Sequence, residues 1–243
     1  MKADTVSALQ RFTLPLVAAG LAALAVALFA MQTRAAEQAV VIPPPAKDAS
    51  ISGAMKTAIF AGGCFWGVQG VFQHVVGVES AVSGYAGGTM ENPSYEDVLT
   101  ETTGHAEAVK VTFDPSVVNY GKLLHIFFSV VHDPTTLNRQ GSDVGPSYRS
   151  ALFTLSDEQR DVASAYIAEL DAAKVFPAKI VTEVTPHTNF YQAEDYHQDN
   201  ATTLNVNAGY VQFFDLPKID NLEAMFPDVW RDEPQLVFAA NAS

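Results

Sequence analysis

Cys64 is the only cysteine among the 243 residues, and it lies in the segment 62–67, Gly-Gly-Cys-Phe-Trp-Gly. A single thiol cannot form an internal disulfide or a zinc–thiolate cluster, so it acts alone or with an outside thiol. The pattern predicts a strand over 56–61, a glycine turn, and a helix over 65–76. This places Cys64 at a helix N-terminus, where free N–H groups favour a thiolate. A lone cysteine is often a small buried hydrophobe, but this setting favours a nucleophile.

Eight further blocks follow Cys64 in an order and at distances that resemble one known family. They are 84–88, 92–95, 104–108, 113–115, 132–134, 139–145, 148–150 and 193–198. Together with 63–67 they are similar to the A-type peptide methionine sulfoxide reductases over 56–227. Several ordered blocks are far more specific than one motif.

Reduction of a sulfoxide needs a nucleophile for sulfur, and a proton and hydrogen-bond donors for the departing oxygen. The resemblance implies that Cys64 is the nucleophile and Glu107 the acid. It also implies that Tyr95 and Tyr148 hold the oxygen and that Asp143 is a polar group of the same pocket. From the residues alone, Glu107 could be a solvent-facing strand residue, the tyrosines half-buried core residues, and Asp143 a turn residue.

The substrate's S-methyl group needs an apolar slot. Phe65 and Trp66 follow Cys64 directly, and the resemblance implies that they form this slot, although core packing is the simpler reading of two aromatics. One side for the oxygen and one for the methyl group makes the site chiral. The resemblance implies the S epimer of methionine sulfoxide, protein-bound or free, and an enzyme of protein repair under oxidative stress.

The chain departs from many family members because it has no resolving cysteine. Leu99 stands where many members have one, and the C-terminal tail has none. A Cys64 sulfenic acid would therefore need an external thiol: a thioredoxin-like, glutaredoxin-like or small-molecule donor. The reductase reading requires no bound cofactor.

The histidines do not predict a metal site. They lack His-x-x-x-His spacing and a cysteine companion, so we interpret them as structural or loop residues. The four considered are His125, His132, His187 and His197. No nucleotide-binding fingerprint is present either.

Composition predicts four parts: residues 1–36 as a signal peptide or an uncleaved N-terminal anchor, 37–55 as a Pro-rich linker, 56–227 as the catalytic domain, and 228–243 as a tail. Phe12 to Met31 is uncharged and apolar, and a small-residue site follows it. We therefore expect export, to the periplasm, with membrane contact only through an uncleaved anchor. The net charge of −13 disfavours nucleic acid as a partner.

The hydrophobic pattern alternates between strands and helices. Besides the elements around Cys64, it predicts strands over 78–85, 105–113, 150–155 and 179–184, and helices over 120–131 and 156–173. Beyond Leu216 it indicates loops, with one helical turn at 221–226. The order of these predicted strands and helices favours an α/β fold. We expect a two-layer sandwich of split βαβ (ferredoxin-like) type with long C-terminal loops.

Two other functions stay open from the residues. A cysteine hydrolase or acyltransferase would need a histidine against the thiol, and only His74 is near Cys64 in sequence. A redox sensor or binding module would use the thiol and the aromatic slot without turnover. Dithiol-dependent turnover distinguishes the reductase from both.

Overall fold

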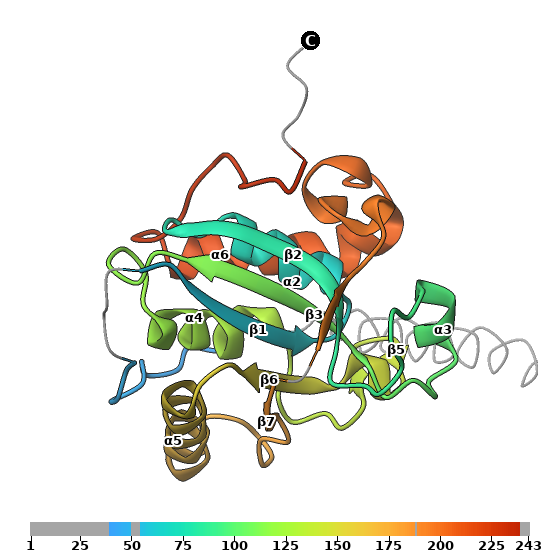
Figure 1. The fold of residues 1–243 in the computed structure, drawn as a ribbon. Helices are drawn as coiled ribbons and strands as arrows, with labels where there is room; N and C mark the ends of the chain where they lie inside the picture. The colour runs from blue at the N-terminus through green and yellow to red at the C-terminus, as the bar shows by residue number, and fades with distance from the viewer. Residues whose placement is uncertain (1–38, 50–53, 188, 239–243) are drawn as a thin grey trace, which may run out of the picture. The chain divides into compact units, whose positions relative to one another are not determined.

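A curved six-stranded sheet runs through the computed structural model, which describes residues 39–49, 54–187 and 189–238 (Figure 1). The strand order is β7-β6-β1-β3-β2-β8, and every neighbouring pair is antiparallel except β6 and β7. The strands are β1 (Lys56–Gly62), β2 (Val78–Ala86), β3 (Ala106–Phe113), β6 (Ser150–Thr154), β7 (Glu183–Pro186) and β8 (Phe190–Gln192).

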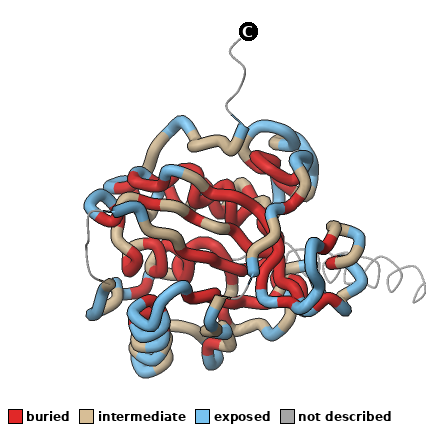
Figure 2. The backbone as a smooth tube through the Cα atoms, viewed as in Figure 1, coloured by how far each residue is buried: buried red, intermediate tan, exposed pale blue. Residues whose placement is uncertain are grey.

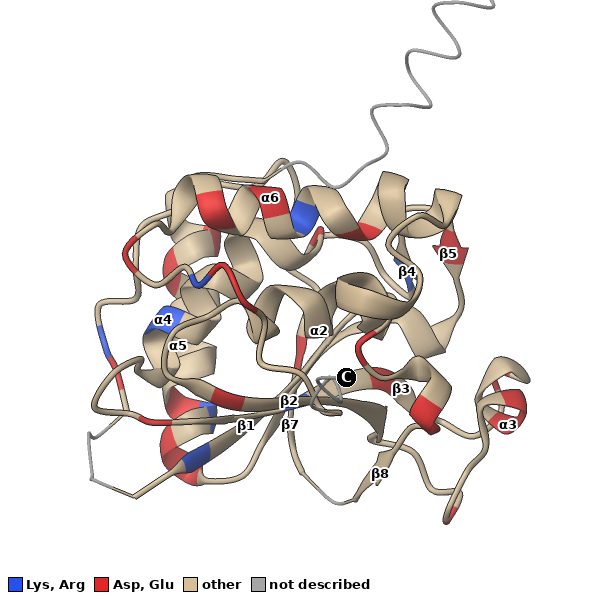
Figure 3. Ribbon diagram, turned by 90° about the horizontal axis from the view of Figure 1, so that it is seen from above, with Lys and Arg blue, Asp and Glu red and all other residues tan. Residues whose placement is uncertain are grey.

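The predicted split βαβ unit is present. Strands β1 and β2 are joined through helix α2 (Phe65–Gln73), and β3 lies between them and pairs with both. Helices α2, α4 (Tyr120–Ile126) and α6 (Leu216–Met225) lie on one side of the sheet (Figure 3). The two-layer α/β prediction is therefore confirmed.

The residues of β3 alternate between the two faces of the sheet. Val109, Val111 and Phe113 belong to the large core between sheet and helices, whereas Ala106 and Ala108 pack in a smaller cluster on the other face. Buried backbone follows the central strands and the helices behind them (Figure 2). Glu107 shares the side of Val109 and is only 2% exposed. The fold thus forces a carboxyl group into an apolar layer.

Helix boundaries follow local signals. Helix α5 (Asp157–Ala173) begins after Ser156, whose side chain accepts a hydrogen bond from Gln159 N–H at 3.1 Å. The Gln159 side chain accepts from Leu155 N–H instead of completing a capping box. The helix predicted over 120–131 is α4 followed by a π-helical turn, Phe127–Val131.

The C-terminal third departs most from the predictions. The strand predicted over 179–184 overlaps β7, which begins four residues and ends two residues later than predicted. Strand β8 was not predicted. The tail beyond Leu216 was expected to be loops, but 216–225 form α6, which buries Ile219 and Leu222 against the core. Its single-turn signal was weak because most of its stability comes from this packing.

Residues 39–49 of the segment predicted as a Pro-rich linker are bound to the domain by hydrogen bonds. Val40 N–H donates to Ser129 O at 2.8 Å, and the Tyr166 hydroxyl donates to Pro43 O at 2.6 Å. Ile42 is 5% exposed in the large core. The described residues of this segment are therefore not a free spacer.

Residues 1–36, on which the signal or anchor interpretation depends, lie outside the described residues. Within the described ranges, no helix has the length and apolarity to cross a bilayer.

Candidate active site

The turn between β1 and α2 presents Cys64. Gly63 has a φ of +87°, and a Cβ there would press against the side chain of Gln140, so the turn needs glycine. Cys64 is the N-cap residue of α2, and its thiol is free. It is 9% exposed and lies in the wall of a cavity. The predicted placement at a helix N-terminus is confirmed.

The first N–H of α2 binds a carboxyl group rather than the thiol. Phe65 N–H donates to Glu107 Oε2 at 2.9 Å. Burial raises the pKa of Glu107 to about 8, with Asp143 and Asp215 adding to the effect and the Phe65 N–H opposing it. Glu107 is thus mostly protonated at pH 7 and holds a transferable proton beside Cys64.

The thiol itself is not a thiolate at rest. Burial raises the pKa of Cys64 well above its usual value, and Glu107 and Asp215 raise it further. The Trp66 N–H acts in the opposite direction. The expectation that the helix N-terminus would favour a thiolate is therefore wrong, because desolvation outweighs the effect of the helix end.

All seven residues predicted for the site line one cavity of about 350 Å³, together with one that was not predicted. The lining residues are Cys64, Phe65, Trp66, Tyr95, Glu107, Asp143, Tyr148 and Tyr210. The lining combines the thiol, the neutral carboxyl and the phenol groups with the aromatic side chains of Phe65 and Trp66. Such a cavity suits a small substrate with one polar and one apolar group.

Tyr95 and Tyr148 enter the cavity from two short helices. Tyr95 opens α3 (Tyr95–Leu99), and Tyr148 ends the 3₁₀ turn η3 (Pro146–Tyr148). Burial raises the pKa of Tyr95 to about 12 and that of Tyr148 above its usual value, and Glu107 is the next cause for both. Both phenols therefore stay protonated and can donate hydrogen bonds.

Glu194 was not predicted, although it lies in a recognised block. Its carboxylate accepts from Tyr95 N–H at 2.9 Å and from the Tyr85 hydroxyl at 2.8 Å. It thus attaches the start of α3 to strand β2. The sequence could not predict this contact, because a charged residue in a loop usually faces solvent.

His197 supports the aromatic side. The Trp66 indole N–H donates to His197 Nδ1 at 3.2 Å, and the His197 ring lies 5.0 Å from Phe65 and 4.4 Å from Tyr95, centroid to centroid. Burial lowers the pKa of His197, which keeps the ring neutral and Nδ1 able to accept. Its interpretation as a structural histidine fits these contacts.

Tyr210 is the eighth lining residue, and its hydroxyl donates to Asp143 Oδ2. It precedes a π-helical turn, Val211–Asp215, in a region without strand or helix periodicity. Only the aromatic side chains of 210–214 could have suggested that this segment packs against the site.

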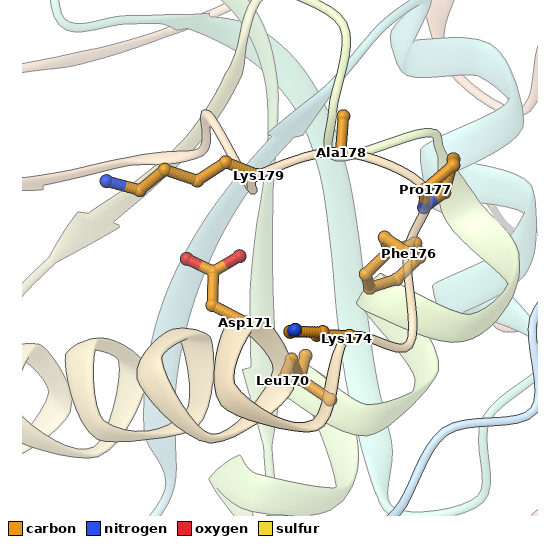
Figure 4. A pocket seen from close by; sticks show the side chains of 7 residues that line it. All are labelled: Leu170, Asp171, Lys174, Phe176, Pro177, Ala178 and Lys179. Carbon is orange, nitrogen blue, oxygen red and sulfur yellow. The ribbon is translucent and has the colours of Figure 1, made fainter.

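A larger cavity, of about 470 Å³, lies at the end of α5 (Figure 4). Leu170, Phe176 and Pro177 line it, with Asp171 and two lysines. It holds no nucleophile or acid pair comparable to Cys64 and Glu107. Among the described residues, no group of three or more His, Cys, Asp or Glu side chains could hold a metal ion.

Comparison with known proteins identifies the family of the chain. The model of the peptide methionine sulfoxide reductase family matches residues 56–228. The chain belongs to the peptide methionine sulfoxide reductase family. A reductase of this family from Mesorhizobium japonicum, MsrA 2, is 53% identical over 194 residues, which cover 80% of this chain and 99% of the relative. The MsrA of Pasteurella multocida is 52% identical over 174 residues, covering 72% and 98%.

Two solved structures have a similar fold. Reduced Mxr1 from Saccharomyces cerevisiae matches with a TM-score of 0.59 and 32% identity, over 66% of this chain and 91% of Mxr1. The methionine sulfoxide reductase A of Corynebacterium diphtheriae matches with a TM-score of 0.50 and 29% identity, over 67% and 85%.

The family membership confirms the predicted enzyme class: the protein is an oxidoreductase that reduces methionine sulfoxide. The hydrolase alternative has no support in the site geometry. The histidine that lies in the aromatic wall, His197, accepts from Trp66 and does not orient the thiol.

Proposed function

We propose that the protein reduces methionine S-sulfoxide, free or in proteins, through a sulfenic acid on Cys64. The observation that carries this proposal is the neutral, buried Glu107 carboxyl in the same cavity as the only thiol. A neutral carboxyl supplies the proton that oxygen needs in order to leave sulfur.

The reaction balances with these two groups. Cys64 sulfur attacks the sulfoxide sulfur while Glu107 gives its proton to the sulfoxide oxygen, and the thiol proton returns to Glu107. The protonated oxygen then passes to Cys64 sulfur as hydroxyl. In this step the new bond between the two sulfur atoms and the sulfur–oxygen bond of the substrate both break. Methionine sulfur gains two electrons, and cysteine sulfur loses two.

The remaining lining residues divide between the two ends of the substrate. Tyr95 and Tyr148 donate to the oxygen, and Asp143 holds the polar side together with Tyr210. Phe65 and Trp66 hold the S-methyl group. Exchange of oxygen and methyl would put a polar atom on the aromatic wall without a hydrogen bond, which is costly. This division favours one epimer.

Recycling needs two external thiols or one dithiol. The first forms a mixed disulfide with Cys64 and releases water, and the second releases the oxidised donor. The chain has no second cysteine for this step. Because Cys64 is 9% exposed at a cavity wall, the donor must insert its thiol into the cavity. Thioredoxin-like, glutaredoxin-like and small-molecule thiols are the candidate classes.

We also propose that the enzyme is exported and works in the periplasm, in protein repair under oxidative stress. The support is the sequence of residues 1–36, with an uncharged apolar run followed by a small-residue site. Cell fractionation of the full chain, with mass analysis of its N-terminus, tests both export and cleavage.

With one equivalent of a methionine S-sulfoxide peptide and no reductant, we expect one equivalent of the methionine peptide to form and Cys64 to be left as a sulfenic acid. This species cannot collapse into an internal disulfide and should accumulate. Intact mass after a dimedone-type trap measures it. Stoichiometric methionine with an untouched Cys64 thiol and no trapped species at any time would contradict the mechanism.

The same experiment addresses the second candidate, a redox sensor or binding module. That protein would form the dimedone adduct with peroxide but would release no methionine from either sulfoxide epimer. The observation that favours this candidate is the free Cys64 thiol, which is buried among aromatic side chains.

A further inference from the structure

Glu101 has a backbone conformation that long side chains rarely adopt. Its φ is +59°, in the left-handed region, directly after the C-cap Thr100 of α3. Glycine or asparagine is the usual residue at such a helix end, because a Cβ is strained there. A glutamate in this position implies that its side chain makes a contact that offsets the strain.

The Glu101 carboxylate makes that contact with η3. Oε2 accepts from Ser147 N–H at 2.9 Å, and Oε1 accepts from the Ser147 hydroxyl at 2.6 Å. Ser147 is 1% exposed, so both donors are shielded from water. Gly145 also lies against the carboxylate, since a Cβ there would overlap Glu101. Two charge-assisted bonds to one buried residue form a rigid bridge.

The bridge joins the two segments that carry the phenols. Glu101 N–H donates to Val98 O, which ties it to α3 and hence to Tyr95. Its partner Ser147 directly precedes Tyr148. We propose that Glu101 is a positioning residue, which fixes Tyr95 and Tyr148 relative to each other around the sulfoxide oxygen. This inference rests on the proposed function.

A second link limits the expected effect. Arg149 donates to Pro146 O at 2.9 Å and to Gly104 O at 3.1 Å, so it also joins η3 to the loop that follows α3. Loss of Glu101 should loosen the phenols rather than unfold the site. Since hydrogen bonds to the oxygen strengthen as it gains charge, loosening should lower the rate more than the substrate affinity.

The test compares the single-turnover rates of Glu101→Gly and Glu101→Gln with a methionine S-sulfoxide peptide. Each rate is divided by the fraction of protein in which Cys64 can be trapped as a sulfenic acid. Glutamine can keep the bridge, accepting from Ser147 N–H and donating to Ser147 Oγ. We expect the maximal rate of Glu101→Gly to fall about 10-fold, with half-saturation within about threefold. Glu101→Gln should stay within about threefold of wild type.

Melting temperature separates positioning from stability. Glycine relieves the strain at 101 while the bridge is lost, so the melting temperature of Glu101→Gly should stay within about 4 °C of wild type. Lys174→Gly is the matched control, because Lys174 also has a positive φ, +51°, at the far end of α5. Its rate should equal that of the wild type.

Three results would overturn the proposal. The first is a Glu101→Gly rate within threefold of wild type. The second is an equal loss in Glu101→Gln, which would assign the effect to charge rather than to the bridge. The third is wild-type protein without sulfoxide turnover, which removes the proposed function and this inference with it. In the first two cases the wild type turns over, so the failures are distinguishable.

Discussion

Replacement of Cys64 by serine is expected to abolish sulfoxide reduction while the fold stays intact. The chain has no other thiol to attack the sulfoxide sulfur, and a serine oxygen cannot be oxidised to a sulfenic acid. A coupled or direct assay of methionine formation with excess dithiothreitol measures the loss, which should reach the background rate of the buffer.

The same variant is expected to be at least as stable as the wild type. Cys64 is the N-cap of α2 but makes no capping hydrogen bond through its side chain. Serine is a preferred N-cap residue, so the free energy of unfolding should rise by up to about 1 kcal/mol. Cys64→Ala serves as the control that cannot cap. Dithiol-dependent turnover by purified Cys64→Ser would contradict the mechanism. A loss of stability would contradict only the capping argument.

The residues near Cys64 could be predicted because local and long-range signals agreed there. The glycine turn fixed the end of β1, the apolar spacing gave α2, and the alternation in β3 placed Glu107 on the side of Val109. The residues alone left a solvent-facing Glu107 open, and only the resemblance placed it in the site. The structure buries this carboxyl, and burial raises its pKa.

The protonation of Cys64 could not be predicted from the same signals. Its thiol faces the helix end but also a desolvated cavity with carboxyl groups, and their balance depends on distances that a sequence does not contain. Tyr210 and Glu194 illustrate the same limit. Each reaches the site from a segment without periodicity, through a contact spanning 67 residues to Asp143 or 99 residues to Tyr95.

Glu107→Gln is expected to slow the reductase step about 10²- to 10⁴-fold, the usual contribution of a general acid. Glutamine keeps the shape and can still accept from Phe65 N–H, so substrate affinity should change little. In wild type the maximal single-turnover rate should fall as pH rises through about 8, because Glu107 loses its proton there. The residual rate of the variant should lack this fall.

The same substitution should change the pH dependence of stability. Because the pKa of Glu107 is raised to about 8 from a usual 4.5, the folded protein holds a proton that the unfolded chain releases in this interval. The contribution of Glu107 to wild-type stability should therefore be full below pH 4.5 and be lost as pH rises through about 8. Glu107→Gln should escape this loss and gain up to about 4 kcal/mol relative to wild type at pH 8 compared with pH 5.

Denaturant unfolding of both proteins across this pH range measures the difference, with Glu96→Gln as the control for loss of an exposed charge on α3. Parallel stability profiles would show that Glu107 is ionised in the folded state and remove it as the acid. A divergence without a rate loss would instead leave a buried neutral carboxyl that takes no part in the proton transfer. If both effects are found, Glu107 lowers the free energy of unfolding above pH 5 and also supplies the proton to the sulfoxide oxygen.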